Sequence, residues 1–202
     1  MNERNENDAV LLRKVKIELR KRMRALRNTA PLSACQARSQ KIIERLLGEP
    51  ELAAAKHVAL FYPIEERHEV DLRALDTALR ARGVSVYYPS IDADTRVMTF
   101  RVVGELEAEL EERGLGFREP AVTAAEPEQL DVVVVPCLAA GPSGHRLGYG
   151  AGFYDRALRR FCPPAWSVAV AYDYQLLADV PYDDSHDTKL AALVTDTRTL
   201  RF

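Results

Sequence analysis

A glycine-rich loop followed by a helical stretch carries the clearest chemistry in this sequence. Glycines recur through residues 141–152, and Arg146 lies among them. The backbone N–H groups of such a loop, together with the N-terminus of the next helix, can bind an anion. Arg146 adds a planar fork of donors suited to phosphate oxygens. Asp155 falls in the first turn of the expected helix, where its carboxylate could face a metal ion bound to those phosphates. The pattern predicts a phosphate site.

Two familiar phosphate motifs do not describe this loop. No Gly-Lys-Ser/Thr follows it, so it is not a Walker A loop, and the spacing of Gly148, Gly150 and Gly152 differs from that of the dinucleotide motif GxGxxG. A surface turn with acidic residues that cap the helix remains an alternative for the loop.

A second group of cations lies near the N-terminus. Lys16 and Arg20 are four residues apart, so they are neighbours on one face of a helix. Two cations that face a cleft can bind a polyphosphate, although a solvated basic face is the alternative. The helix is indicated by apolar residues at helical spacing, which are Leu12, Val15, Leu19, Met23 and Leu26.

The loop and several other segments resemble one enzyme family. The string RLGYGAGFYDRAL resembles RxGxGxGYYDxxL, a signature of the 5-formyltetrahydrofolate cyclo-ligase family. Phe153 stands where that family more often has tyrosine. Further resemblances run from residue 16 to residue 195, and they include KIELR at 16–20, EVD at 69–71, GLGFREP at 114–120 and VPYDDSHD at 180–187. We expect Phe117, Glu119 and Pro120 to form one wall of the cleft.

The resemblance implies ATP- and Mg²⁺-dependent cyclisation of 5-formyltetrahydrofolate to 5,10-methenyltetrahydrofolate, with release of ADP and phosphate. It implies that Lys16, Arg20 and Arg146 are catalytic contacts to ATP phosphates, and that Asp155 and Asp187 bind the magnesium ion. The remaining ATP-binding residues that it implies are Gly148, Tyr149, Gly150, Ala151, Gly152, Phe153 and Tyr154.

For the folate substrate, the resemblance implies contacts by Tyr62, Glu69, Met98 and Tyr154. The carboxylate of Glu69 is a good acceptor for the amino group and ring N–H of a pterin. Glu65 and Glu66 compete with it for this role, and all three fit a solvated acidic loop as well. Met98 suits either an aromatic ligand or the core. His186 is either a ligand, a base or a structural residue.

Two other functions stay open. The chain could be a different ATP-dependent ligase or kinase that acts on a small acid, since the same phosphate loop would serve. It could also bind folate without catalysis, although the Arg, Gly and Asp residues together argue against this.

The elements that position these residues are indicated by hydrophobic periodicity. Strands are predicted at residues 57–62, 84–88, 98–103, 132–136, 166–171 and 190–195, with helices between several of them and an acidic helical patch at 105–112. The order strand, helix, strand favours a parallel sheet, with ligands beyond the carboxyl ends of the strands. We therefore predict a single α/β domain over residues 1–202, Rossmann-like, with a mainly parallel central sheet flanked by helices. Residues 1–9 are expected to be disordered.

Composition limits the partners. The chain has 202 residues and a formal net charge of −2, which fits one soluble domain and gives no support for nucleic-acid binding. Its three cysteines show no CxxC spacing, which is typical of reduced thiols in the cytoplasm. No apolar run approaches the roughly 20 residues that span a bilayer, so no membrane is expected. We expect a monomer that acts on small molecules.

Overall fold

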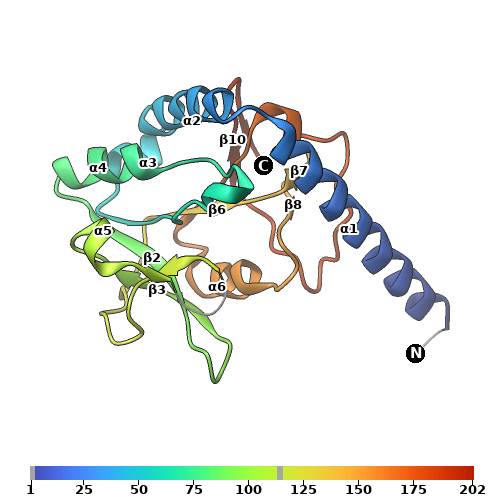
Figure 1. Ribbon diagram of the computed structural model, residues 1–202. Coiled ribbons are helices and arrows are strands. Elements are labelled where there is room, and N and C mark those ends of the chain that lie inside the picture. The colour runs from blue at the N-terminus through green and yellow to red at the C-terminus, as the bar shows by residue number, and fades with distance from the viewer. Residues whose placement is uncertain (1–2, 113–115) are drawn as a thin grey trace.

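The six predicted strands and a seventh, β11, assemble into one sheet in the computed structural model, which describes residues 3–112 and 116–202 (Figure 1). The strand order is β11-β10-β9-β6-β1-β2-β3. The pairs from β10 through β9, β6 and β1 to β2 are parallel, whereas β3 and β11 run antiparallel at the two edges. The mainly parallel α/β fold is confirmed. The strand bounds are β1 His57–Ala59, β2 Ser85–Ile91, β3 Met98–Val102, β6 Val132–Pro136, β9 Trp166–Val170, β10 Ala192–Val194 and β11 Thr199–Arg201.

Both faces of the sheet are buried by helices, and this explains the run of valines in β6. Val132 and Val134 join the core under α2 (Leu32–Leu47), α3 (Pro50–Ala54) and α4 (Arg73–Ala81). Val133 and Val135 face the opposite way, into the cluster that contains residues of α6 (Phe153–Phe161). Because successive strand side chains alternate between faces, a strand covered on both sides must be apolar throughout.

Helix α1 (Glu3–Thr29) lies along one side of the body, and its N-terminal end extends beyond it (Figure 1). The helix begins at Glu3, so it includes most of the stretch for which we expected disorder. Residues 1–2 lie outside the described residues. The predicted apolar stripe is wrong at Val15 and Leu26, which are 45% and 43% exposed. Only a narrow face of the helix packs against the body. On this face Met23 is buried against Leu138 and Leu147.

Several short elements were not predicted from the sequence. Two of them, β7 (Ala139–Ala140) and β8 (Arg146–Leu147), form a hairpin inside the glycine-rich loop. The acidic patch at 105–112 is helical only in α5 (Leu106–Glu109), since β4 (Glu111–Glu112) pairs with β5 (Arg118–Glu119). Gly114, part of one motif, falls outside the described residues. Two 3₁₀ turns complete the elements, η1 (Glu65–Arg67) and η2 (Asp173–Gln175).

No helix within the described ranges is long and apolar enough to cross a membrane.

Candidate active site

The glycine-rich loop connects β6 to α6 and is held against α1. Gly150 has φ +105° and Gly152 has φ +68°, a region that favours glycine. A Cβ at Gly150 would lie 3.1 Å from Cζ of Arg20. The Arg20 Nε donates a hydrogen bond to the carbonyl oxygen of Gly148 at 2.9 Å. The guanidinium therefore lies directly on the loop, and glycine is needed where it does so.

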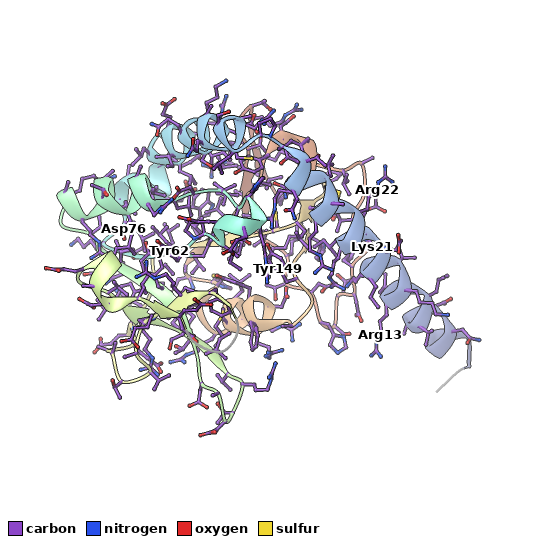
Figure 2. The ribbon with its side chains drawn as sticks, in the orientation of Figure 1. Arg13, Lys21, Arg22, Tyr62, Asp76 and Tyr149 are labelled. Atoms are coloured by element: carbon purple, nitrogen blue, oxygen red, sulfur yellow. The ribbon has the colours of Figure 1, made fainter. Side chains whose placement is uncertain are left out.

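The face of α1 that meets the body is cationic as well as apolar. Lys16 and Arg20 are half-buried and Arg27 is buried, all on the side that carries Leu19 and Met23. These positions follow the helical repeat. Other cations of the helix, such as Lys21 and Arg22, are exposed and project from it (Figure 2). The helical spacing predicted Lys16 and Arg20 on one face. Arg27 was not predicted there, although the spacing from residue 20 to residue 27 is two helical turns.

On the nucleotide side, two of the three proposed phosphate-binding cations have an aspartate partner. Lys16 Nζ donates to Asp187 Oδ2, and Arg146 Nη1 donates to Asp155 Oδ1 at 2.9 Å. Arg146 is 7% exposed, and its Nε has no partner among the described residues. Thr188, which the sequence analysis missed, joins the two aspartates in space, because its backbone N–H donates to Asp155 Oδ1 at 3.1 Å.

The charges of the same aspartates also act on Arg20. Burial lowers the pKa of the Arg20 guanidinium, while the charges of Asp187 and Asp155 act in the opposite direction. The structure thus brings together Lys16, Arg20, Arg146, Asp155 and Asp187, which the sequence spreads over most of the chain.

The two aspartates suit a magnesium ion that arrives with nucleotide phosphates. The described part of the chain has no group of three or more His, Cys, Asp or Glu residues that could hold a metal ion by themselves. Magnesium keeps several waters and needs only one or two carboxylates beside the phosphates of a substrate. Within residues 3–112 and 116–202, Asp155 Oδ2 and Asp187 Oδ1 have no hydrogen-bond partner. These residues fit such an ion.

Glu69 is joined to the loop through Tyr149 and is buried, at 7% exposure. Its Oε2 accepts a hydrogen bond from the backbone N–H of Ile64 at 2.9 Å, and its Oε1 accepts one from the Tyr149 hydroxyl. The Tyr172 hydroxyl donates to the carbonyl oxygen of Glu69 at 3.0 Å. By contrast, Glu65 pairs with Arg73 at the surface and Glu66 is exposed. Glu69 is therefore the one of the three whose carboxylate points inward.

Tyr149 and Tyr154 connect the two sides. Tyr149, which we expected to bind the nucleotide, is half-buried and directs its hydroxyl to Glu69. The hydroxyl of Tyr154 makes no hydrogen bond with any described residue. Burial raises the pKa of Tyr154, with the charge of Glu69 acting in the same direction and that of Arg146 against it. Tyr154 therefore lies near both Glu69 and Arg146, with a free hydroxyl.

The other predicted folate contacts have partners within the protein. Tyr62 lies beside the guanidinium groups of Arg73 and Arg118, at 5.8 and 5.0 Å from its ring centroid. Met98 is 7% exposed and belongs to the apolar cluster against which Phe153 and Tyr154 pack. Its side chain thus lies in the core in this arrangement, and its contact with a substrate stays a prediction.

Two residues of the matched motifs have structural partners. Glu119, which we expected in a wall of the cleft, is buried and accepts a hydrogen bond from the Ile91 backbone N–H at 2.7 Å. His186 is 77% exposed and bonds to Asp183 and Ser185 of its own turn. Hydrogen bonds from the Ser185 hydroxyl and then from His186 hold the pKa of Asp183 at about 2, well below its usual value.

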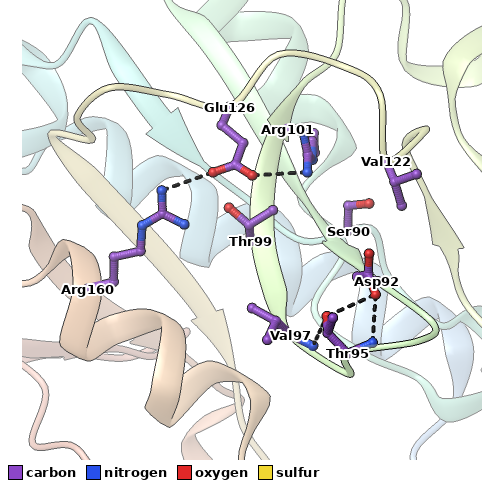
Figure 3. Close-up of a pocket in the computed structure, with 9 residues that line it drawn as sticks. All are labelled: Ser90, Asp92, Thr95, Val97, Thr99, Arg101, Val122, Glu126 and Arg160. Atoms are coloured by element: carbon purple, nitrogen blue, oxygen red, sulfur yellow. Dashed lines mark hydrogen bonds and ion pairs between the residues drawn. The ribbon is translucent and has the colours of Figure 1, made fainter.

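A separate hollow of about 290 Å³ lies beside β2 and β3 (Figure 3). Glu126 bridges Arg101 and Arg160 there, at 3.0 and 2.9 Å. None of the predicted site residues lines this hollow, so it is distinct from the candidate site.

Comparison with known proteins gives a consistent result. A sequence model described as the 5-formyltetrahydrofolate cyclo-ligase family matches residues 13–196. A 5-formyltetrahydrofolate cyclo-ligase of Escherichia coli K12 is 29% identical over 167 residues, which is 81% of this chain and 90% of that protein. One from Mycolicibacterium smegmatis is 41% identical over 86 residues, 41% of this chain and 44% of that protein. The NMR structure of Aquifex aeolicus 5,10-methenyltetrahydrofolate synthetase is similar with a TM-score of 0.79 and 31% identity, over 93% of this chain and 92% of that one.

Proposed function

Since the chain belongs to the 5-formyltetrahydrofolate cyclo-ligase family, we propose that it converts 5-formyltetrahydrofolate and ATP to 5,10-methenyltetrahydrofolate, ADP and phosphate. Beside the family match, the observation that carries this proposal is a site with a cationic side for the nucleotide and a side with Glu69 for the folate. Arg20 lies on the glycine loop that contains Arg146, and Lys16 pairs with Asp187. The buried Glu69 carboxylate accepts a hydrogen bond from Tyr149 of the same loop.

The reaction needs no nucleophile from the protein, but it requires that the two substrates be aligned. The formyl oxygen attacks the γ-phosphorus of ATP, and ADP leaves. N10 then attacks the activated formyl carbon and loses its proton, and the oxygen departs with phosphate. In-line alignment and neutralisation of charge on the phosphoryl group are the tasks left to the protein. The three cations suit the second task.

The ion pairs of the site support Mg-ATP, rather than free ATP, as the co-substrate. Phosphate oxygens that take Lys16 and Arg146 would leave Asp187 and Asp155 without their present cationic partners. Magnesium bound to the phosphates supplies the compensating positive charge. Asp155 and Asp187 would each offer their free carboxylate oxygen to that ion.

On the folate side, Glu69 would accept hydrogen bonds from the amino group and ring N–H of the pterin. Tyr154 would contact the substrate between the two halves, because its hydroxyl is free and lies near both Glu69 and Arg146. Tyr62 and Met98 complete the proposed folate set. The loop residues 148–154 would bind ATP through their backbone N–H groups, whereas the side chain of Tyr149 is directed to Glu69.

We also propose a monomer that acts in the cytoplasm on small molecules and not on nucleic acid. The net charge of −2 and the three free thiols support this. Light scattering should give the mass of one chain, about 22.7 kDa.

A single assay tests the activity. The purified protein is mixed with Mg-ATP and 5-formyltetrahydrofolate, and the absorbance of the methenyl product is followed. Product is expected only when both ATP and magnesium are present. ATP hydrolysis stimulated by another small acid, and not by 5-formyltetrahydrofolate, would contradict the proposal. Full activity in EDTA would remove magnesium from it.

A further inference from the structure

Helix α1 places a third cation, Arg27, inside the protein. Arg27 is 2% exposed and lies two helical turns beyond Arg20 on the same face. Burial by itself lowers the pKa of Arg27, but the Tyr149 hydroxyl and the Glu69 carboxylate raise it above its usual value. A buried guanidinium is costly unless it is paired. Its partners are therefore the reason why it is tolerated here.

The partners of Arg27 form a chain that ends on Glu69. Arg27 Nη2 donates to the hydroxyl oxygen of Tyr149, and that hydroxyl in turn reaches Glu69 Oε1. Arginine has donors only, so Tyr149 must accept from Arg27 and direct its own hydrogen to the carboxylate. Arg27 Nη2 also lies 3.8 Å from Glu69 Oε1. The direction of both hydrogen bonds is fixed by Arg27.

Tyr149 is held in place by its surroundings as well. Its ring lies beside the guanidinium groups of Arg27 and Arg67, at 5.7 and 5.1 Å from the ring centroid. Burial raises the pKa of the Tyr149 hydroxyl, and the charge of Glu69 adds to this effect. The hydroxyl is thus a neutral donor, with a single orientation set by the arginine behind it.

We propose that Arg27 is a positioning residue for the folate substrate, and that it acts through Tyr149 on the carboxylate of Glu69. This rests on the proposed function, in which Glu69 accepts from the pterin. Tyr149 holds one carboxylate oxygen and the Ile64 N–H holds the other, so the plane of the carboxylate cannot rotate. Each oxygen still has a lone pair for a ligand donor. Arg27 touches neither substrate.

The first experiment compares Arg27→Met and Tyr149→Phe with Arg22→Met, a matched control on the exposed side of α1. The KM for 5-formyltetrahydrofolate should rise about 10-fold or more in both test variants, as expected when a bond to a buried charged group is lost. The KM for ATP and kcat should change much less, and the control should change neither. Arg27→Lys should restore part of the affinity, because it keeps the charge but not the fork.

The second experiment separates positioning from a general structural role. Dissociation constants for 5-formyltetrahydrofolate are measured by calorimetry for Arg27→Met and Tyr149→Phe, each with and without Glu69→Gln. If Arg27 acts through Glu69, its loss should cost far less affinity in the Glu69→Gln background. Equal losses in both backgrounds would overturn the proposal, as would a rise confined to the KM for ATP. Tyr149→Phe keeps the ring, so it carries the test if Arg27→Met does not fold.

Measurements on the wild-type protein separate the role of Arg27 from the proposed function. If it converts 5-formyltetrahydrofolate while both test variants keep its KM, then the role of Arg27 is wrong and the function stands. If it neither binds nor converts 5-formyltetrahydrofolate, the proposed function is wrong and the role of Arg27 fails with it.

Discussion

Arg146 shows how one residue of the site can be unfavourable in the free protein and favourable when the nucleotide is bound. Its guanidinium is buried, donates to Asp155 and keeps one N–H without a partner within the described ranges. A buried donor without a partner costs free energy. A phosphate oxygen would satisfy it, so the same feature that is unfavourable in the free protein would favour the bound nucleotide.

Arg146→Lys tests this role. Lysine keeps the positive charge but offers no planar pair of donors. Turnover is expected to fall on the order of 10²-fold or more, as when a donor to a transferring group is removed, with a smaller change in folate binding. Steady-state kinetics against Arg160→Lys, whose guanidinium lies in the separate hollow, gives the comparison. Unchanged turnover would place Arg146 outside the phosphate site.

Glu69→Gln and Asp155→Asn should separate the two sides of the site. Glu69→Gln replaces one acceptor oxygen by an NH₂ group, which would meet the pterin amino group and leave a donor unpaired. The expected penalty is ~1–3 kcal/mol, seen as a raised KM for folate with little change for ATP. Asp155→Asn should show the opposite pattern. Substrate titrations on both variants, with circular dichroism as a check of folding, measure this. Equal effects of Glu69→Gln on both substrates would remove Glu69 from the folate side.

At the scale of elements, α1 and the β7–β8 hairpin determine the shape of the site. The cations of α1 reach the loop because Met23 packs against Leu138 and Leu147 on either side of the hairpin turn. His145 precedes Arg146 in this hairpin, is 6% exposed and stacks on Tyr182 with 3.8 Å between ring centroids. The hairpin thus orients Arg146 through the packing of its neighbour.

Stability should depend on pH through His145. Burial lowers the pKa of its imidazole, and the charges of Asp184 and Asp187 only partly oppose this. The unfolded chain, in which His titrates near 6.5, then binds more protons than the folded one just below that pH. The contribution of neutral His145 to the stability of the fold is therefore fully present above the usual histidine range, and it is lost as the pH falls through that range.

Urea denaturation at about pH 7.5 and about pH 5.5, on either side of the histidine range, measures the effect. The wild type should lose stability between the two pH values, and His145→Phe should lose less because it has no proton to bind there. An identical loss in the variant would show that other groups cause the pH dependence.

At the scale of the whole molecule, the sheet is the rigid support for both sides of the site. Leu193 of β10 is fully buried within the cluster that also contains residues of β6, β9 and α6. Leu193→Ala is expected to lower the free energy of unfolding by ~2–5 kcal/mol through lost burial and a cavity. Leu32→Ala, at a side chain that is 56% exposed, should have little effect. Denaturant unfolding measures both, and similar values for the two variants would contradict the assigned core.

The sequence by itself determined the class of fold and the identity of many site residues. Four consecutive valines require a strand that is covered on both faces, and the glycines after it mark a loop whose backbone has unusual φ angles. These are local properties of residue type and spacing, so they can be predicted without knowledge of distant contacts. The arrangement of Lys16 and Arg20 on one helical face is local in the same sense.

Only the tertiary structure decided which strands pair and which side chains contact one another. Periodicity is the same in parallel and antiparallel strands, so only the pairing of β3 with β2 fixes its direction. Strand β11 was not predicted, and it is recognised only through its pairing with β10. Whether an arginine on α1 is exposed, like Arg22, or buried, like Arg27, depends on what lies opposite that face. Tyr149 was predicted on the nucleotide side from its place in the loop, yet its hydroxyl reaches Glu69. Contacts between distant segments depend on how the chain packs, and neither composition nor spacing records that.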